Sequence, residues 1–503
     1  MNVHLLHPHA DFSPETALPE PAVDLIADLD LARIFDAMAS GDGFVRDVVE
    51  RTVMLSLEEP RVIRYRQAIM QDALSNPNAI RRLYRLSCEA LERRKRHFFF
   101  GVTTRFPSSI LHESAELLTT MTEMLRELKA EIGRDREVFE APGLIEFAAM
   151  LDRDLSEEYL ATLEQYLADL RRRDNVVLRA WLGQGLKSAD YTLLKRTKPE
   201  GWMDRLLGRG PARYTFQIPE RDQGGISALA EIRDRGINEV ANTLAQSVEH
   251  VLGFFQQLKT ELGFYIGGIN LADWLGERGY SRCMPDLADS TAWTLSFHGL
   301  RDLGLALTTD RVVVGNDFDG RDLSLMIITG ANQGGKSTFL RSLGQAQLML
   351  QAGLFVAAEH FCASIMTGSA SHFAREEDPT MERGKFEEEL GRMSRLVGAT
   401  RPGALMLWNE SFQATNEREG SDVAQEVTKA LVDSGVRIAF VTHLNAYAEA
   451  LFEENRTDRA FLRAERLNDG TRTYRIVPGT PTETSFGIDL YRQIFGRQHA
   501  LEP

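Results

Sequence analysis

The sequence predicts a multidomain protein, in which an α-helical part with a small β-containing insertion precedes an α/β P-loop domain. Over residues 21–172, apolar side chains recur at helical spacing, as in Leu117, Met121, Met124, Leu125 and Leu128. After residue 295, apolar strand-like runs alternate with helical segments, which is typical of a mostly parallel sheet covered by helices. A glycine-rich loop of the phosphate-binding type follows one of these runs.

Length and composition fit a water-soluble chain of more than one domain. The chain has 503 residues, of which 43% are hydrophobic and 26% are charged, and a chain of this length is expected to form about two to four domains. The net charge of −15 excludes a protein that holds nucleic acid through its overall charge. Three cysteines are too few for a disulfide framework, and there is no secretion signal or membrane-length apolar stretch. We therefore expect a cytoplasmic protein with no membrane contact.

Three segments are expected along the chain: an irregular tail over 1–20, a helical core over 21–295 and the P-loop domain over 296–503. Within the core, glycine and proline separate short strands expected at 175–181, 191–194 and 213–218. A long helix follows this insertion, with apolar residues from Leu244 to Leu262 spaced alternately four and three apart. The strands expected in the last segment are Val312–Val314, Leu325–Ile328, Ala404–Leu407 and Val436–Val441.

The phosphate loop carries the most specific signal. Gly330, Gly335, Lys336 and Ser337 satisfy G-x-x-x-x-G-K-[ST], with an expected strand before them and a helix after them. Glycine lets successive backbone N–H groups face a phosphate, and the positive end of the following helix adds to that field. Lys336 is expected to neutralise the β and γ oxygens of ATP, and the Ser337 hydroxyl to bind Mg²⁺.

Two further strands end in candidate catalytic residues. Asn409 and Glu410 follow the strand ALMLW, and Glu410 is expected to act as the general base for the attacking water. An aspartate at position 409 would hold the Mg²⁺ shell with a full charge, so the amide of Asn409 predicts slower hydrolysis with binding retained. His443 ends the next strand and is a candidate sensor of the γ-phosphate; the alternative is a core or capping histidine.

These motifs resemble the ATPase domain of the MutS family of mismatch-repair proteins. The resemblance covers roughly residues 300–495 and rests on TGANQGGKST, QAGLFVAA, NESFQATNEREGSD, VTHLNAYAEAL and YRIVPGTPTETSFGIDL. Upstream, EEPRVIRYRQAIMQDAL and SALAEIRDRGINEVANTLAQ resemble the helical core that carries the lever and clamp of that family. Asn332 and the glycine pair Gly334 and Gly335 distinguish this loop from a generic phosphate loop.

The resemblance implies an ABC-type ATPase that forms a homodimer and whose sites are completed by the partner chain. The implied cofactors are ATP and Mg²⁺, with the metal held by Ser337, Glu410 and, through water, Asn409. The implied catalytic residues are Glu410, Lys336 and His443. The implied nucleotide-binding residues are Gly330, Ala331, Asn332, Gln333, Gly334, Gly335, Lys336, Ser337, Thr338 and Asn409.

The contact made to the partner's nucleotide is expected from MERGKFEEELGRM. Its candidate residues are Gly384, Lys385, Phe386 and Glu389. Gly384 stands where the family usually has serine, so a backbone N–H at the helix start would replace a hydroxyl. Ser411, Thr415 and Asn416 are expected to form the loop that crosses between the two sites, and Phe297 and His298 are the candidates for stacking on adenine.

Compared with mismatch-reading members of that family, the sequence lacks room for the separate N-terminal domain with its Phe-x-Glu motif. DNA contact is therefore expected from local basic patches, although mismatch-specific binding is not. One patch, 93–97, precedes three phenylalanines, and another extends over the insertion from Lys187 to Arg213. Each patch also fits a solvated surface. His4, His7 and His9 lack the spacing of a metal site.

Three functions compete. The first is an ATPase that clamps DNA in repair or recombination. The second is an ATP-binding dimerisation switch that hydrolyses little and acts through protein partners, which Asn409 and Gly384 favour. The third is the same ATPase acting on structured RNA. The MutS-like loop argues against an ABC transporter subunit.

Overall fold

The computed structural model describes residues 1–100, 107–171, 177–182, 188–194, 223–288, 292–375, 384–467 and 471–481. The chain divides into two compact units. Unit 1 consists of Met1–Val3, Arg81–Phe139 and Ile145–Lys259, and unit 2 consists of His4–Ile80, Glu140–Leu144 and Thr260–Pro503. The predicted combination of a helical part and an α/β part is confirmed, while the three predicted segment boundaries stay predictions.

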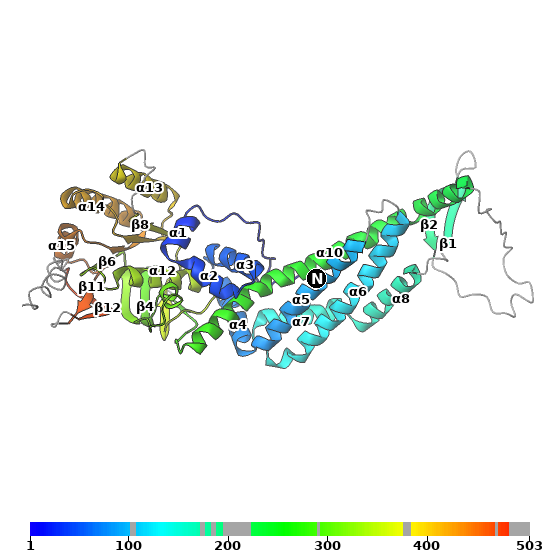
Figure 1. The fold of residues 1–503 in the computed structure, drawn as a ribbon, viewed down its shortest axis with the longest axis horizontal. Helices are drawn as coiled ribbons and strands as arrows, with labels where there is room; N and C mark the ends of the chain where they lie inside the picture. Colours follow the sequence, from blue (N-terminus) through cyan, green and yellow to red (C-terminus); the bar gives the residue numbers. More distant parts are fainter. Residues whose placement is uncertain are drawn as a thin grey trace, which may run out of the picture. The chain divides into compact units, whose positions relative to one another are not determined.

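Unit 1 is mainly helical (Figure 1). Its helices are α5 (Pro77–Phe100), α6 (Pro107–Arg134), the 3-10 helix η1 (Arg136–Val138), α7 (Pro142–Asp154), α8 (Glu157–Arg171) and α10 (Gln223–Glu277), of which α5, α7 and α10 continue into unit 2. The predicted apolar stripes pack inward: Met121, Met124 and Leu128 of α6 are buried, and so are Val248 and Phe255 of α10. Core packing of these helices is therefore confirmed.

Part of the predicted insertion forms a hairpin. β1 (Val177–Leu182) pairs antiparallel with β2 (Ser188–Leu194). The two expected strands are confirmed within a few residues of their predicted ends. The third expected strand, at 213–218, lies outside the described residues, as do the basic residues from Lys187 to Arg213.

The N-terminal tail is irregular, and from His4 onward it belongs to unit 2, where part of it is buried in the core. Leu5 and Leu6 are 0% exposed. The buried carboxylate of Glu261 on α10 accepts the backbone N–H groups of Leu5, Leu6 and Phe12. A buried acid that accepts several N–H groups satisfies a backbone that has no secondary structure. This acid lies some 250 residues away in sequence, so its role was not predicted.

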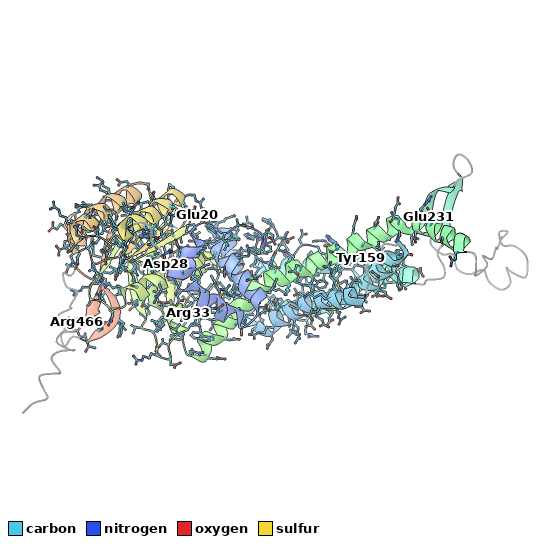
Figure 2. The ribbon with its side chains drawn as sticks, turned by 45° about the horizontal axis from the view of Figure 1, so that its top comes forward. Glu20, Asp28, Arg33, Tyr159, Glu231 and Arg466 are labelled. Atoms are coloured by element: carbon cyan, nitrogen blue, oxygen red, sulfur yellow. The ribbon has the colours of Figure 1, made fainter. Side chains whose placement is uncertain are left out.

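Four short helices follow the tail in unit 2. They are α1 (Ala22–Asp28), α2 (Leu31–Ala39), α3 (Gly43–Met54) and α4 (Pro60–Ser75). The Asp42 carboxylate caps α3 by accepting from the N–H groups of Phe44 and Val45. α1 lies beside the edge strand β8 (Figure 1), and Asp28 at its end is labelled in Figure 2.

The mostly parallel sheet predicted for the C-terminal part is confirmed. Six strands form it: β6 (Leu325–Thr329), β8 (Ser369–Phe373), β9 (Leu405–Asn409), β10 (Arg437–Val441), β11 (Arg459–Arg466) and β12 (Arg472–Pro478). Their order is β12-β11-β6-β10-β9-β8, and only β12 is antiparallel to its neighbour. Ile328, Val441 and Asn409 stand in register, so the carboxyl ends of the three central strands meet at one edge.

Helices cover this sheet (Figure 1). They are α12 (Lys336–Ala352), α13 (Lys385–Ala399), α14 (Glu417–Asp433) and α15 (Asn445–Glu453). Trp408, Phe412, Phe440 and Tyr447 form the buried aromatic part of one core cluster between the sheet and α13, α14 and α15. Among the described helices, none has the length and apolar character needed to cross a membrane.

A second sheet of four strands was not predicted. It contains β3 (Asp286–Leu287), β4 (Trp293–Leu300), β5 (Asn316–Leu323) and β7 (His360–Ala363), in the order β3-β7-β4-β5, and the short helix α11 (Leu303–Ala306) follows β4. The strand predicted at Val312–Val314 is wrong, because β5 begins at Asn316. Val312 is 75% exposed, and the N–H of Val313 donates to the Tyr280 hydroxyl instead of a neighbouring strand.

Candidate functional site

The phosphate loop, residues 330–337, connects β6 to α12. Gly330 and Gly335 have φ values of 110° and 94°, where a side chain would be strained. A Cβ on Gly334 would lie 2.6 Å from the Ala464 Cβ of β11. Glycine at these positions is therefore a requirement of the loop's backbone. Ala331 is buried, and Asn332 and Gln333 are exposed.

Lys336, the first residue of α12, is only 5% exposed. Its Nζ donates to the carbonyl oxygens of Gly330 at 2.8 Å and Ala331 at 3.1 Å, and lies 3.3 Å from Nε2 of His443. Burial lowers the pKa of Lys336 to about 8, although the nearby Glu410 carboxylate opposes this shift. The loop therefore surrounds a buried amine near its own carbonyl groups.

Two polar side chains connect the start of α12 to the end of β9. The Ser337 hydroxyl donates to Oδ1 of Asn409 at 2.9 Å. Thr338, next on the helix, is half-buried. Amide and hydroxyl oxygens are hard ligands of the kind that Mg²⁺ accepts. Their convergence at the carboxyl edge of the sheet is what the motif spacing predicted.

Glu410 and His443 stand at the same edge. Oε1 of Glu410 lies 3.3 Å from Nε2 of His443. The hydrogen bond from His443 is the main cause that lowers the pKa of Glu410, and it outweighs the opposing effect of burial. Glu410 is therefore held as a carboxylate. His443 lies between Lys336 and Glu410, so the structure brings together the three predicted catalytic residues.

A loop of residues 410–416, which we call the Glu410 loop, leads from β9 to α14. Glu410 and Phe412 have φ values of 57° and 65°, which are unfavourable for residues other than glycine. The N–H of Glu410 donates to the Val441 carbonyl at 2.8 Å. The N–H of Phe412 donates to Oε1 of Glu389 at 2.6 Å. Contacts from β10 and α13 thus hold this strained backbone.

The four candidates for a contact to a partner chain lie at the start of α13. Gly384 and Lys385 are exposed, with Gly384 as the N-cap residue. Phe386 packs against the core, and Glu389 is buried against the Glu410 loop of its own chain. Burial raises the pKa of Glu389, while the backbone N–H groups it accepts oppose this shift. Only the first two residues therefore face outward.

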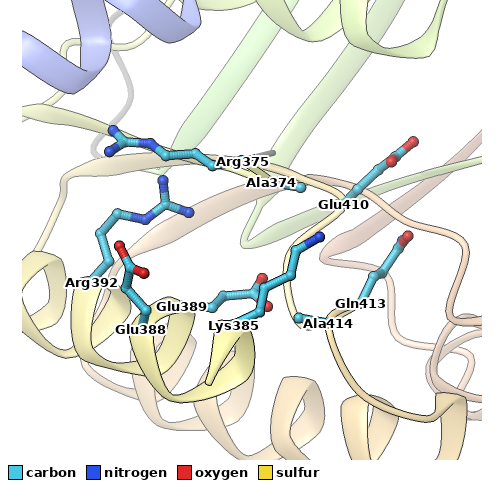
Figure 3. Close-up of a pocket in the computed structure, with 9 residues that line it drawn as sticks. All are labelled: Ala374, Arg375, Lys385, Glu388, Glu389, Arg392, Glu410, Gln413 and Ala414. Carbon is cyan, nitrogen blue, oxygen red and sulfur yellow. The ribbon is translucent and has the colours of Figure 1, made fainter. Parts of the chain in front are cut away.

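A pocket of about 240 Å³ lies between α13 and the Glu410 loop. Figure 3 shows Arg375 and Arg392 on one side of it and Glu410 and Gln413 on the other, with Lys385 between them. The remaining lining residues are Ala374, Glu388, Glu389 and Ala414. Side chains of both positive and negative charge line the pocket, which reaches the predicted general base Glu410.

Sequence reasoning missed that the hairpin of β11 and β12, whose second strand overlaps the segment YRIVPGTPTETSFGIDL, lies against the phosphate loop. This hairpin carries Arg466 (Figure 2). Arg472 donates to the Gln333 side chain at 2.8 Å. A Cβ on Gly335 would lie 3.1 Å from the Tyr474 carbonyl oxygen. The Tyr474 side chain is 51% exposed, and its φ is 60°. No spacing in the sequence relates this hairpin to the loop, which is more than 130 residues away.

Other predicted candidates have different surroundings. Phe297 is 3% exposed and packs on Phe339 and Phe361, so the structure contradicts it as a residue that stacks on adenine. His298 is exposed and lies 2.6 Å from an Asp317 carboxylate oxygen and 3.3 Å from one of Glu359.

Residues of the basic patch and of the N-terminal histidine group also make polar contacts within the chain. In the basic patch, Arg93 pairs with Glu89 and Arg94 with Glu249, while the side chains of 96–100 lie outside the described residues. Nε2 of His7 contacts the Arg66 guanidinium at 2.9 Å. Within the described ranges, His, Cys, Asp and Glu form no group of three that could hold a metal ion.

Comparison with known proteins identifies both parts of the chain. The MutS2 N-terminal domain matches residues 58–278, and MutS domain V matches residues 326–499. A DNA mismatch repair protein MutS of Chlorobium phaeovibrioides is 26% identical over 302 residues, which are 58% of this chain and 34% of that protein. An Endonuclease MutS2 of Thermus thermophilus is 30% identical over 170 residues, which are 34% of this chain and 23% of that protein.

An Endonuclease MutS2 of Halothermothrix orenii is 28% identical over 171 residues, or 34% of this chain and 21% of that protein. The chain thus matches about a third or less of the length of these relatives. Both domain matches name the same family, and they include the helical core as well as the strands and loops of the candidate site. The chain belongs to the MutS family.

Proposed function

We propose that the protein binds and hydrolyses ATP at the carboxyl edge of the six-stranded sheet, as a dimeric MutS-like ATPase associated with DNA. One observation carries the proposal: Lys336 and Ser337 after β6, Asn409 and Glu410 at the end of β9, and His443 after β10 converge within hydrogen-bond or ion-pair distance. Ligands of open α/β sheets bind at this edge.

The phosphate loop supplies the site for the triphosphate. Its glycines allow backbone N–H groups to approach phosphate oxygens, and α12 adds the positive end of its dipole. Lys336 would exchange the carbonyl oxygens of Gly330 and Ala331 for phosphate oxygens. Because burial disfavours its charge, a polyanion that enters the loop favours the protonated ammonium.

The donor set also fits Mg²⁺. Ser337 contributes a hydroxyl oxygen, Glu410 a carboxylate, and Asn409 an amide oxygen that acts through water. The bound ion would neutralise charge on the β and γ oxygens. These are oxygen ligands on adjacent elements, which suits a hard cation better than the nitrogen and sulfur sites of transition metals.

Hydrolysis would use Glu410 as the general base and His443 as its partner. The lowered pKa keeps Glu410 ionised and able to accept a proton from water. His443 lies next to both Glu410 and Lys336, so it can position the water and sense the γ-phosphate. Tyr474 replaces Phe297 as our candidate for stacking on the base of the nucleotide, because this residue is exposed and its backbone lies against Gly335 of the loop.

The partner chain would meet the nucleotide at the start of α13. Gly384 and Lys385 are exposed there, and free N–H groups at a helix N-terminus attract anions. Support for DNA as the partner molecule, in repair or recombination, comes from family membership and from relatives named as DNA mismatch repair proteins.

The test is steady-state ATP hydrolysis by the purified protein, alone and with homoduplex, mismatched or branched DNA, or structured RNA. We expect turnover that DNA stimulates and that Lys336→Ala removes. Stimulation by structured RNA alone would identify RNA, and not DNA, as the nucleic acid on which the protein acts. ATP binding without stimulated turnover would contradict the clamp ATPase.

That last result would favour a second function, a nucleotide-dependent dimerisation switch. A specific observation supports this alternative: Asn409, rather than a carboxylate, accepts the Ser337 hydroxyl where Mg²⁺ would bind. An amide holds a divalent cation less strongly than a carboxylate does. A protein with this function would form a dimer when it binds ATP, and the dimer would dissociate slowly.

A further inference from the structure

A buried polar chain begins at Ser411, the residue after Glu410. Oγ of Ser411 donates to the backbone carbonyl of His372 at 2.9 Å and lies 2.7 Å from Nδ1 of the same histidine. A hydroxyl has one hydrogen, and the carbonyl accepts it. With the hydroxyl hydrogen on that carbonyl, Nδ1 of His372 carries the ring proton and donates to Ser411.

The other ring nitrogen of His372 then accepts. Nε2 lies 3.3 Å from a guanidinium nitrogen of Arg392, which also donates to the Phe373 carbonyl at 2.8 Å. Burial, together with the Arg392 charge, lowers the pKa of His372 to about 3, so the ring is neutral. The result is a directional chain from Arg392 through His372 to Ser411.

This chain begins on the helix that carries the proposed contact to the partner. Arg392 lies on α13, two turns after Lys385. Glu389 of the same helix accepts the N–H of Phe412. One helix thus contacts two successive residues of the Glu410 loop: Phe412 directly through Glu389, and Ser411 indirectly through His372.

The Glu410 loop needs such support. Glu410 and Phe412 both have left-handed backbone conformations, which persist only where surrounding contacts enforce them. Ser411 lies between them and is fully buried. A change in the position of Ser411 therefore changes the direction of the Glu410 carboxylate.

We propose that His372 is a positioning residue, which transmits the position of α13 through Ser411 to Glu410. This inference rests on the hydrolytic role proposed above for Glu410. A partner that engages the exposed start of α13 would, through Arg392 and His372, set the geometry of general-base catalysis. His372 itself contacts neither nucleotide nor water in this role.

Two substitutions distinguish the roles of the two ring nitrogens of His372. The amide nitrogen of His372→Asn takes the place of Nδ1 and keeps the donor to Ser411. The amide of His372→Gln reaches the place of Nε2 and keeps only a partner for Arg392. We expect His372→Gln to lower kcat roughly 10- to 100-fold with KM for ATP little changed, and His372→Asn to restore most of kcat.

Ser371→Ala is the matched control on the same strand, because Ser371 contacts Asp28 of α1 and not the Glu410 loop. Ser411→Ala should lower kcat as His372→Gln does, and the double variant should be no worse than either, because both act through one hydrogen bond. Multiplied losses, or equal losses in His372→Asn and His372→Gln, would overturn the proposal.

Hydrogen exchange tests the same chain without turnover. Amides of 410–416 should exchange faster in His372→Gln than in the wild type, with His372→Asn and Ser371→Ala close to the wild type. Unchanged exchange in His372→Gln would overturn the positioning role. The wild-type protein could show no ATP turnover while the amides of 410–416 exchange as expected in the variants. That result would contradict the proposed hydrolytic function but support the link from His372 to the Glu410 loop.

Discussion

The phosphate loop and the Glu410 loop lie at the same edge of one sheet and reach unusual backbone conformations by different means. In the phosphate loop, two of the positive φ values fall on Gly330 and Gly335, for which they carry no steric cost, and a third falls on Gln333. In the Glu410 loop, they fall on Glu410 and Phe412 and are enforced by β10 and α13. The phosphate loop therefore obtains most of its geometry from its own glycines, whereas the Glu410 loop depends on contacts with the surrounding fold.

The first way to test this contrast is to remove the charge of the locally encoded loop. Lys336→Ala should reduce ATP turnover by about 10²–10³-fold, because its ammonium has no substitute near the phosphates. It should also weaken ATP binding. Lys429→Ala, on the exposed face of α14, is the matched control. Equal turnover in both variants, measured at saturating ATP, would show that phosphates bind elsewhere.

The second test disturbs the loop that depends on its surroundings. Gly420→Ala on α14 would place a Cβ 2.3 Å from the Phe412 carbonyl oxygen. We expect the Glu410 loop to shift, at a cost of about 1–3 kcal/mol in the free energy of unfolding. ATP turnover should also fall, because the shift displaces Glu410.

Gly391→Ala on α13 is the control, since its Cβ would meet nothing within 4 Å. It should raise stability by about 0.5–1 kcal/mol, as alanine does inside a helix. Denaturant unfolding should therefore give changes of opposite sign for two substitutions of the same chemistry. The same sign for both would mean that α14 does not support the loop.

This contrast also explains how much of the molecule was predictable. The parallel strands and the residues that end them follow local patterns, so Lys336, Glu410 and His443 were found without coordinates. The roles of Glu389 and Arg472 were not, because each makes its contact with a distant segment. The apolar run Val312–Val314 has the pattern of a strand, yet the N–H of Val313 donates to the Tyr280 hydroxyl and not to a neighbouring strand.

A third test addresses Asn409, which lies where an acidic residue is expected at the Mg²⁺ site. Asn409→Asp should increase turnover several-fold, on the order of 1 kcal/mol in the barrier, because a carboxylate binds the Mg²⁺ shell more strongly. The Mg²⁺ concentration for half-maximal rate should fall. Unchanged kinetics would show that the amide suffices and would weaken the switch as an alternative.

The smallest expected effect concerns pH and the buried histidine beside the Glu410 loop. The pKa of His372 is about 3 in the fold, below its ordinary value of 6.5, so the unfolded chain binds a proton that the folded chain refuses. Stability from this group is present above pH 6.5 and is lost as pH falls toward 3.

His372→Asn should reduce that slope by up to about 1.4 kcal/mol per pH unit, the equivalent of one proton. His7, with a pKa of about 4, supplies a slope of its own that remains. Unfolding measured from pH 7 to 5 tests this. An unchanged slope would mean that His372 is protonated in the fold.

The most direct test of the account compares binding with turnover in Glu410→Gln. Glutamine keeps the size of the side chain and removes its ability to accept a proton. We predict ATP binding close to that of the wild type and turnover lower by about 10²–10⁴-fold. Turnover near the wild-type rate in Glu410→Gln would contradict the account, because the hydrolytic base would then lie outside the loop described here.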